Sequence, residues 1–236
     1  FLVLSLLDFF STQKLDRIKE PDVITTDLSA VDDYDQAHKS SLVLLYALNL
    51  QIIQILLKNT KNLSVLDLAC GPGVFTQLIS KSLSVSEIMG VDLSEPMLKK
   101  ARNRFSNETL PCSFKFQLQD ISDFSFLENE KFDLITFMNA SHHISDLVSV
   151  KKIIEEASRV CKKDGIIFIS DHTRPKTNTI LKIYYNWISR KNKLHRLPAH
   201  NLDFYNSLYA GWSTIDFLNM IPSNSDRNWF QIYPLG

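Results

Sequence analysis

Two glycines, Gly71 and Gly73, stand two positions apart directly after a short apolar run, and an amphipathic stretch over residues 74–83 follows them. The pattern predicts a strand, a tight loop and the start of a helix. Glycine has no Cβ, so its backbone can approach a ligand closely. Loops of this kind bind nucleotides at the carboxyl ends of parallel strands. The residue types and their spacing therefore predict a nucleotide-binding loop.

The residues around this loop indicate the charge of its ligand. A dinucleotide fingerprint has a third glycine three residues after Gly73, where this chain has Thr76. Asp67, inside the predicted strand, would repel a pyrophosphate and suits a ligand with an amine or another cation. A strand–helix corner that binds nothing is the alternative that this segment alone leaves open.

Further polar residues follow the other predicted strands. Asp92 is placed to accept hydrogen bonds from both hydroxyls of a ribose, and Asp120 can accept one from an exocyclic amine. Ser94 is a predicted helix N-cap. The last two strands are followed by Asn139, Ser141, His142, His143, Asp171 and His172. Their coincidence at five strand ends indicates a common site.

A parallel sheet would bring these residues together. Strands alternate with helices, which predicts a doubly wound α/β fold with helices on both faces of the sheet. Right-handed crossovers place the loops that follow the strands on one rim. The predicted strands cover residues 64–69, 87–91, 114–118, 133–138 and 166–170. Alternating polarity predicts that the third lies near an edge, whereas the continuous apolar fifth is expected to be central and buried.

The second half of the chain carries fewer signals. A helix is expected over about residues 148–163, with Gly165 in a left-handed conformation after its end. Residues 174–211 are expected to be the least regular part of the chain. A short helix is predicted from Ser213 or Thr214, and a last strand over residues 228–233.

Composition narrows the class of protein. The chain has 236 residues, 44% of them hydrophobic, enough for one sizeable core or one domain with a cap. Lys+Arg and Asp+Glu each total 26, so a broad nucleic-acid interface is not expected. The three cysteines have no metal-binding spacing and favour a reducing, cytoplasmic compartment. The apolar N-terminus, interrupted by Asp8, is too short for a transmembrane segment.

In combination these motifs resemble those of class I S-adenosylmethionine-dependent methyltransferases. The similarity covers about residues 60–173. It is carried by residues 65–73 (VLDLACGPG), 90–98 (GVDLSEPML), 119–121 (QDI), 132–135 (FDLI) followed by 142–144 (HHI), and 159–165 (RVCKKDG). The resemblance implies a Rossmann-like, mostly parallel sheet of seven strands, the last antiparallel, and S-adenosylmethionine as the cofactor.

The resemblance also implies a role for each residue of the loop set. Asp67 would hold the amine end of the cofactor, and the Gly71–Gly73 loop would let the backbone pass close to it. Asp92 would bind the ribose. The full implied cofactor set is Asp67, Ala69, Cys70, Gly71, Gly73, Asp92, Leu93, Met97, Asp120, Ile121, Asn139 and Ala140.

Methyl transfer from a sulfonium needs alignment and the exclusion of water, and it needs a base only if the acceptor must lose a proton. His142 and His143 are the candidate catalytic residues, and His172 and Arg174 the candidate acceptor-binding residues. Packing or orienting the loop is the alternative role for the histidine pair. No metal site is expected from the sequence.

The expected organisation is an N-terminal cap or lid (residues 1–58) and a methyltransferase domain (residues 59–236), with residues 174–211 as a substrate-side insertion. The residues after the fourth strand differ from the pattern of enzymes that methylate amino groups of nucleic-acid bases, which favours a small-molecule acceptor. A catalytically silent scaffold with this fold is one alternative. A nicotinamide-dependent oxidoreductase is another, disfavoured by the missing third glycine.

Overall fold

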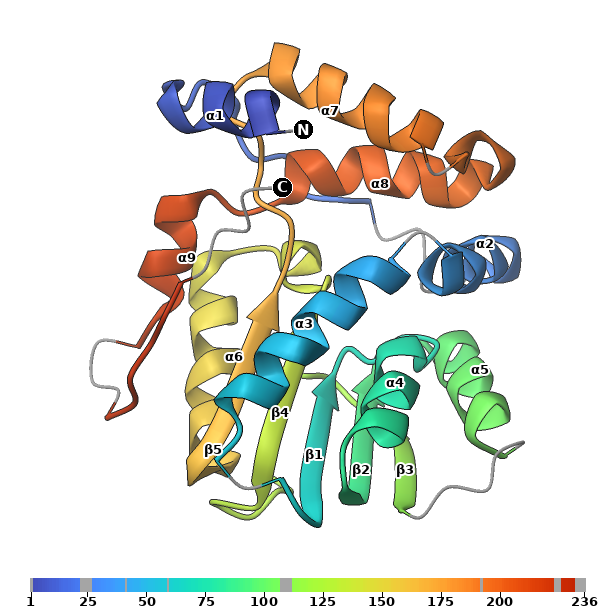
Figure 1. The fold of residues 1–236 in the computed structure, drawn as a ribbon, viewed down its shortest axis with the longest axis vertical. Coiled ribbons are helices and arrows are strands. Elements are labelled where there is room, and N and C mark those ends of the chain that lie inside the picture. Colours follow the sequence, from blue (N-terminus) through green and yellow to red (C-terminus); the bar gives the residue numbers. More distant parts are fainter. Residues whose placement is uncertain are drawn as a thin grey trace.

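A computed structural model describes residues 2–21, 27–40, 42–58, 60–106, 112–191, 193–222 and 226–231. Five parallel strands among these residues form one sheet in the order β3-β2-β1-β4-β5 (Figure 1). The strands are β1 (Leu63–Leu68), β2 (Val85–Asp92), β3 (Ser113–Leu118), β4 (Phe132–Met138) and β5 (Cys161–Ser170). The predicted α/β class and all five predicted strands are therefore confirmed.

Helices cover both faces of the sheet, as a doubly wound fold requires. One core combines β1 and β2 with α3 (Val43–Leu56), α4 (Val74–Ser82) and α5 (Glu95–Ser106). The core on the other face includes α6 (Leu147–Val160). Every residue of β1 is buried as a result, and this places Asp67 inside the protein.

A layer of helices lies over the carboxyl ends of the strands (Figure 1). We call it the cap; it consists of α1 (Leu2–Phe10), α2 (Leu28–Ser40), α7 (Asn178–Lys191) and α8 (Pro198–Ala210). Within the cap, α1 packs on α7 and α2 packs on α8. The remaining elements are the short helices η1 (Ser141–His143) and η2 (Leu194–Arg196), and α9 (Thr214–Met220).

Residues 174–211 are more regular than predicted, since α7, η2 and α8 occupy most of this range. The rings of Tyr185 and Phe204 stack with their centroids 6.1 Å apart, and Leu181 is fully buried. These contacts between helices stabilise the segment and cannot be recognised from local sequence. The helix predicted from Ser213 or Thr214 is confirmed, with Ser213 as its N-cap.

A helix was predicted over residues 148–163, and the predicted position of its end was wrong. The helix ends at Val160, and β5 begins at Cys161, which pairs with Phe132. Gly165 therefore lies inside a strand and has no left-handed φ. A Cβ at Gly165 would lie 2.9 Å from the Asp133 carbonyl oxygen, so glycine is needed there for a close strand approach.

The sheet also differs from the predicted seven strands, because the described residues form only five. Among the described residues β5 is therefore an edge strand, half-buried over 165–170, and the prediction that it is central and buried was wrong. β3 forms the other edge, as predicted. Residues 228–231 adopt no strand, and residues 232 and 233 of the predicted last strand lie outside the described residues.

Candidate functional site

Asp67 lies at the centre of the sheet with only 2% of its surface exposed. Its two carboxylate oxygens accept hydrogen bonds from the hydroxyls of Thr76 on α4, at 2.5 Å, and of Thr136 on β4, at 2.7 Å. Thr136 is its register partner on the neighbouring strand. Burial raises the pKa of Asp67 to about 6, because a buried carboxylate loses its hydration and no cation compensates it.

The loop that contains Gly71 and Gly73 follows directly after β1. Gly71 and Gly73 both have positive φ, at 54° and 73°. A Cβ at Gly73 would lie 3.0 Å from the Cβ of Ala101, so this glycine also lets α4 approach α5. The residues that follow β1 and β4, Ala69 and Asn139, are left-handed as well (φ 50° and 49°). Strained backbone at two neighbouring strand ends is typical of a functional rim.

Asp92, at the end of β2, is hydrogen-bonded to the same loop. Its oxygens accept from the backbone amides of Gly71 and Ser94, each at 2.8 Å. Burial raises the pKa of Asp92. The Leu93 amide also interacts with this carboxylate, whose four lone pairs still leave capacity to accept a hydrogen bond from a ligand.

The predicted adenine-side residues have mixed environments. Leu93 is 59% exposed, whereas Met97 and Ile121 are buried. Asp120 is exposed, and its Oδ1 accepts a hydrogen bond from the Ser122 amide at 2.8 Å. These four residues therefore combine an exposed apolar surface with an accessible carboxylate.

A cavity of about 20 Å³ lies between the glycine loop and the cap, with room for about one water molecule. Two cap residues, Tyr34 and His38, close it from the side of α2. Its complete lining is Tyr34, His38, Tyr46, Asp67, Ala69, Cys70, Gly71, Val74, Phe75 and Met138. Buried Asn139 lies nearby, at the end of β4, and its Nδ2 is a donor without a hydrogen-bond partner.

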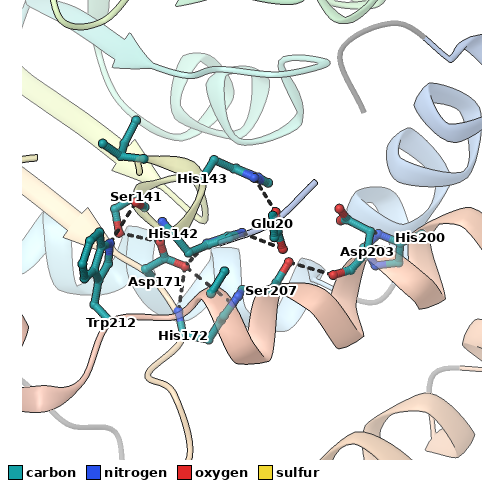
Figure 2. A network of polar contacts seen from close by, with 12 residues as sticks. Glu20, Ser141, His142, His143, Asp171, His172, His200, Asp203, Ser207 and Trp212 are labelled. Carbon is teal, nitrogen blue, oxygen red and sulfur yellow. Dashed lines mark hydrogen bonds and ion pairs between the residues drawn. The ribbon is translucent and has the colours of Figure 1, made fainter. Parts of the chain in front are cut away.

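A second polar group lies past β4 and β5 (Figure 2). Asp171 accepts hydrogen bonds from the Ser141 hydroxyl at 2.6 Å, from His142 Nδ1 at 2.7 Å and from the His142 amide at 3.0 Å. Burial opposes its charge, but His142 and His172 outweigh burial and hold the pKa of Asp171 well below its usual range. Asp171 thus fixes the His142 ring with Nε2 directed away from it.

Glu20 joins this group from the N-terminal segment. Its Oε2 lies 2.5 Å from His143 Nδ1, while its Oε1 lies 4.0 Å from His142 Nε2 and has no hydrogen-bond partner. Burial disfavours the charge on His143, but the hydrogen bond and ion pair with Glu20 raise the pKa of His143 to about 9. The His143 side chain is 37% exposed, so a cation at neutral pH is presented to solvent.

Arg17 holds the segment that carries Glu20. Its guanidinium donates to the carbonyl oxygens of Ala210 at 2.7 Å, Ser145 at 2.7 Å, His142 at 2.8 Å and Ile144 at 2.6 Å. The same group stacks on the Trp212 ring, 3.7 Å from its centroid. Arg17 therefore links the N-terminal segment to the histidine loop and to the chain after α8.

The two predicted acceptor-binding residues differ in their surroundings. The His172 ring lies 4.3 Å from that of His142, and burial together with His142 lowers the pKa of His172 to about 4. Arg174 is 7% exposed and donates to the carbonyl oxygens of Leu15 at 3.0 Å and Gly211 at 2.7 Å. Two of its donors thus hold the N-terminal segment and the chain after α8, and its acceptor-binding role stays a prediction.

Asp203 on α8 was not identified from the sequence and faces the same group (Figure 2). Burial and the charge of Glu20 raise its pKa to about 7. Glu20, Arg17 and Asp203 lie in segments without a recognisable motif, and a long-range fold brings them to the rim.

No single helix among the described residues has the length and apolar character to cross a bilayer. Only α2 and α3 taken together, bent by 61° at their junction, meet that criterion.

A family model described as a methyltransferase domain matches residues 59–219. An uncharacterized methyltransferase of Bacillus subtilis, YcgJ, is 29% identical over 70% of this chain and 59% of its own length. A demethylmenaquinone methyltransferase of Bacteroides fragilis is 31% identical over 50% of this chain and 47% of its own. The chain thus spans about half to three-fifths of the length of these curated relatives.

Solved structures support the fold. A putative S-adenosylmethionine-dependent methyltransferase from Methanococcus maripaludis has a TM-score of 0.55 at 17% identity, covering 83% of this chain and 86% of its own. The plantazolicin methyltransferase BpumL has a TM-score of 0.58 at 21% identity, covering 81% and 66%. With the matched domain, the glycine loop and the ordered carboxylates at the strand ends, the chain belongs to the class I S-adenosylmethionine-dependent methyltransferase family.

Proposed function

We propose that this chain transfers a methyl group from S-adenosylmethionine to a small-molecule acceptor. The observation that carries the proposal is the joint placement of Asp67, Asp92 and the glycine loop beside the histidine group, all at one rim of the sheet. Bound S-adenosylmethionine supplies a methyl group that is already activated by its cationic sulfur. The protein's task is to bind, to align and to exclude water.

The residues present fit that cofactor. Burial raises the pKa of the Asp67 carboxyl, and the ammonium group of the cofactor would stabilise its charged form. Asp92 has lone pairs left for ribose hydroxyls after binding Gly71 and Ser94. The buried Asn139 side chain, beside Tyr46, supplies a donor close to the end of β4.

Cofactor binding requires the cap to move. Pockets that bind small molecules such as this cofactor measure roughly 300 Å³ or more, whereas the cavity beside Asp67 measures about 20 Å³. Tyr34 lies over Gly71, since its ring would be 3.9 Å from a Cβ built there. We therefore assign α2 the role of a lid that withdraws from the loop. Unchanged hydrogen exchange in α2 after S-adenosylhomocysteine binds would contradict this role.

The acceptor side is assigned to the histidine group. His143 is held protonated by Glu20 and serves as a positive contact for an electron-rich acceptor instead of a base. His142 Nε2 and Glu20 Oε1 are the free nitrogen and oxygen that face each other across 4.0 Å. These two atoms mark the side of the site from which the acceptor approaches.

The relatives support a small acceptor by their names alone. They include the demethylmenaquinone methyltransferase and a ubiquinone biosynthesis O-methyltransferase from Hydrogenovibrio crunogenus, 27% identical over 54% of this chain. The balanced charge of 26 basic and 26 acidic residues also provides no general attraction for a polyanion.

Turnover with methyl-labelled S-adenosylmethionine and a panel of quinol, phenol, amine and carboxylate acceptors tests the proposal. We expect labelled product from at least one class, and loss of it in Asp92→Ala. Asp123→Ala is the matched control, because Asp123 accepts a similar turn hydrogen bond from Ser125 away from the loop. Cofactor binding without transfer to any class would favour a silent binding protein over an enzyme.

A further inference from the structure

We infer that Glu20, His142 and His143 form a binding site for a divalent transition-metal ion of the Zn²⁺ type. One potential ligand atom from each residue lies within 4.8 Å of the other two. Two imidazoles and one carboxylate form a common ligand set for such ions and leave positions open for other ligands. The inference deepens the proposed function, because the open positions face the acceptor side.

The orphan atom of Glu20 points to a ligand. Its side chain is 5% exposed and Oε1 has no hydrogen-bond partner, although buried carboxylate oxygens are normally paired. His142 Nε2 lies 4.0 Å from this oxygen, too far for a hydrogen bond, and the Ser207 hydroxyl also lies near the carboxylate. A metal ion bound by both atoms at about 2.0–2.2 Å would satisfy them together.

The surroundings of His142 resemble the support that metal-binding histidines have. His142 Nδ1 is hydrogen-bonded to Asp171 at 2.7 Å, which orients the ring and leaves Nε2 free to bind. A carboxylate on the second ring nitrogen is the usual partner of a histidine ligand. The carboxylate oxygens of Asp171 already accept hydrogen bonds from Ser141, His142 and the His172 amide, so they have no lone pair left for a metal ion. This excludes the rival set of His142, Asp171 and His172.

The position of the ion gives it a chemical role. Figure 2 shows Glu20 beside both histidines, with Ser207 and Asp203 of α8 on its other side. A cation there would bind an acceptor oxygen and stabilise its deprotonated form, so the acceptor would lose its proton to water at lower pH. His142 and His143 then act as ligands and not as bases, and binding of the ion displaces the proton that His143 carries in the ion-free protein.

Metal titration of the purified protein, first stripped with a chelator, tests the inference. We expect one equivalent of Zn²⁺ by elemental analysis, and visible absorption bands of a bound ion when Co²⁺ is used as the probe. Glu20→Gln and His142→Gln should weaken Zn²⁺ binding at least about 100-fold. Asp171→Asn should weaken it about 10–100-fold through the second ring nitrogen.

His200→Gln is the matched control, because His200 is a buried histidine of the cap outside the trio, and binding should be unchanged. X-ray absorption of the wild-type zinc complex gives a readout that needs no variant: we expect nitrogen and oxygen ligands, including two imidazoles. Sulfur ligands, the absence of binding in the wild-type protein, or unchanged binding in folded Glu20→Gln and His142→Gln would each overturn the site. S-adenosylmethionine binding measured in chelator tests the proposed function separately.

Discussion

The Asp92 carboxylate accepts a hydrogen bond from the Gly71 amide at 2.8 Å, which ties the end of β2 to the loop after β1. The same side chain accepts from Ser94 at the start of α5. One residue thus sets the shape of the loop and the edge of the proposed ribose site.

Replacing Asp92 with Asn keeps the size of the side chain but removes the charge and one acceptor. The backbone amide of either Gly71 or Ser94 then faces the side-chain NH₂ group of the asparagine, which cannot accept its hydrogen bond. Hydrogen bonds to charged groups contribute about 1.5–3 kcal/mol, so we expect cofactor affinity to fall about 10–100-fold by calorimetry. Asp123→Asn should leave it unchanged. Equal affinity for Asp92→Asn and wild type would contradict the ribose role.

The raised pKa of Asp67 predicts a pH effect on stability. The unfolded carboxyl ionises near 3.8 and the folded one near 6. Between these values the folded state binds more protons, so this residue makes stability fall as pH rises from about 4 to about 6. The shift corresponds to about 3 kcal/mol. Denaturant unfolding at several pH values should show this fall in stability for the wild type and not for Asp67→Asn.

Asp67 also predicts the pH dependence of cofactor binding. A cationic amine prefers the ionised carboxylate, so affinity should rise as pH increases from about 5 to about 7 and then level off. Calorimetric titrations over this range measure it. A profile in Asp67→Asn with the same slope as the wild type would show that the cation lies elsewhere.

Arg17 is expected to position the site without touching the cofactor. Arg17→Ala removes a guanidinium that donates to four carbonyl groups, three of them in the loop after β4. We expect a loss of about 2 kcal/mol of stability, with faster proteolysis of the N-terminal segment. Lys14→Ala, nearby in the same segment, is the control. An unchanged melting temperature for Arg17→Ala would contradict the role of Arg17.

Substitution of the two loop glycines is expected to lower the stability of the protein by different amounts. Gly71→Ala and Gly73→Ala both force a left-handed alanine, which costs roughly 1–2 kcal/mol. At Gly73 the new Cβ also meets Ala101 at 3.0 Å, whereas at Gly71 the nearest atom is 3.9 Å away. Gly73→Ala should therefore be the less stable variant in denaturant unfolding. The reverse order would show that the α4–α5 contact is not tight.

The part of the fold that local patterns determine was predictable. The five parallel strands, the glycine loop and the Ser94 cap depend on neighbouring residues, and the structure confirms them. The position of β5 in the sequence was predicted correctly, but its burial was not. An apolar run of residues does not tell whether a strand lies at the centre or at the edge of a sheet. The start of β5 at Cys161 is set by pairing with Phe132, a contact that α6 separates from it in sequence.

The same distinction holds for the site. His142, His143 and Asp92 could be found because they follow strands in recognisable motifs. Glu20 could not, since nothing in its segment indicates that Arg17 anchors it beside His143. The expectation that no metal site exists rested on the spacing of the cysteines, whereas the site proposed above would be assembled from segments far apart in the sequence.

Calorimetric titration of the folded wild-type protein with S-adenosylmethionine tests the central claim most directly. The arrangement of Asp67, Asp92 and the glycine loop predicts a single site with micromolar affinity, and competition by S-adenosylhomocysteine. No heat of binding and no competition at millimolar cofactor, in protein shown to be folded, would contradict the claim.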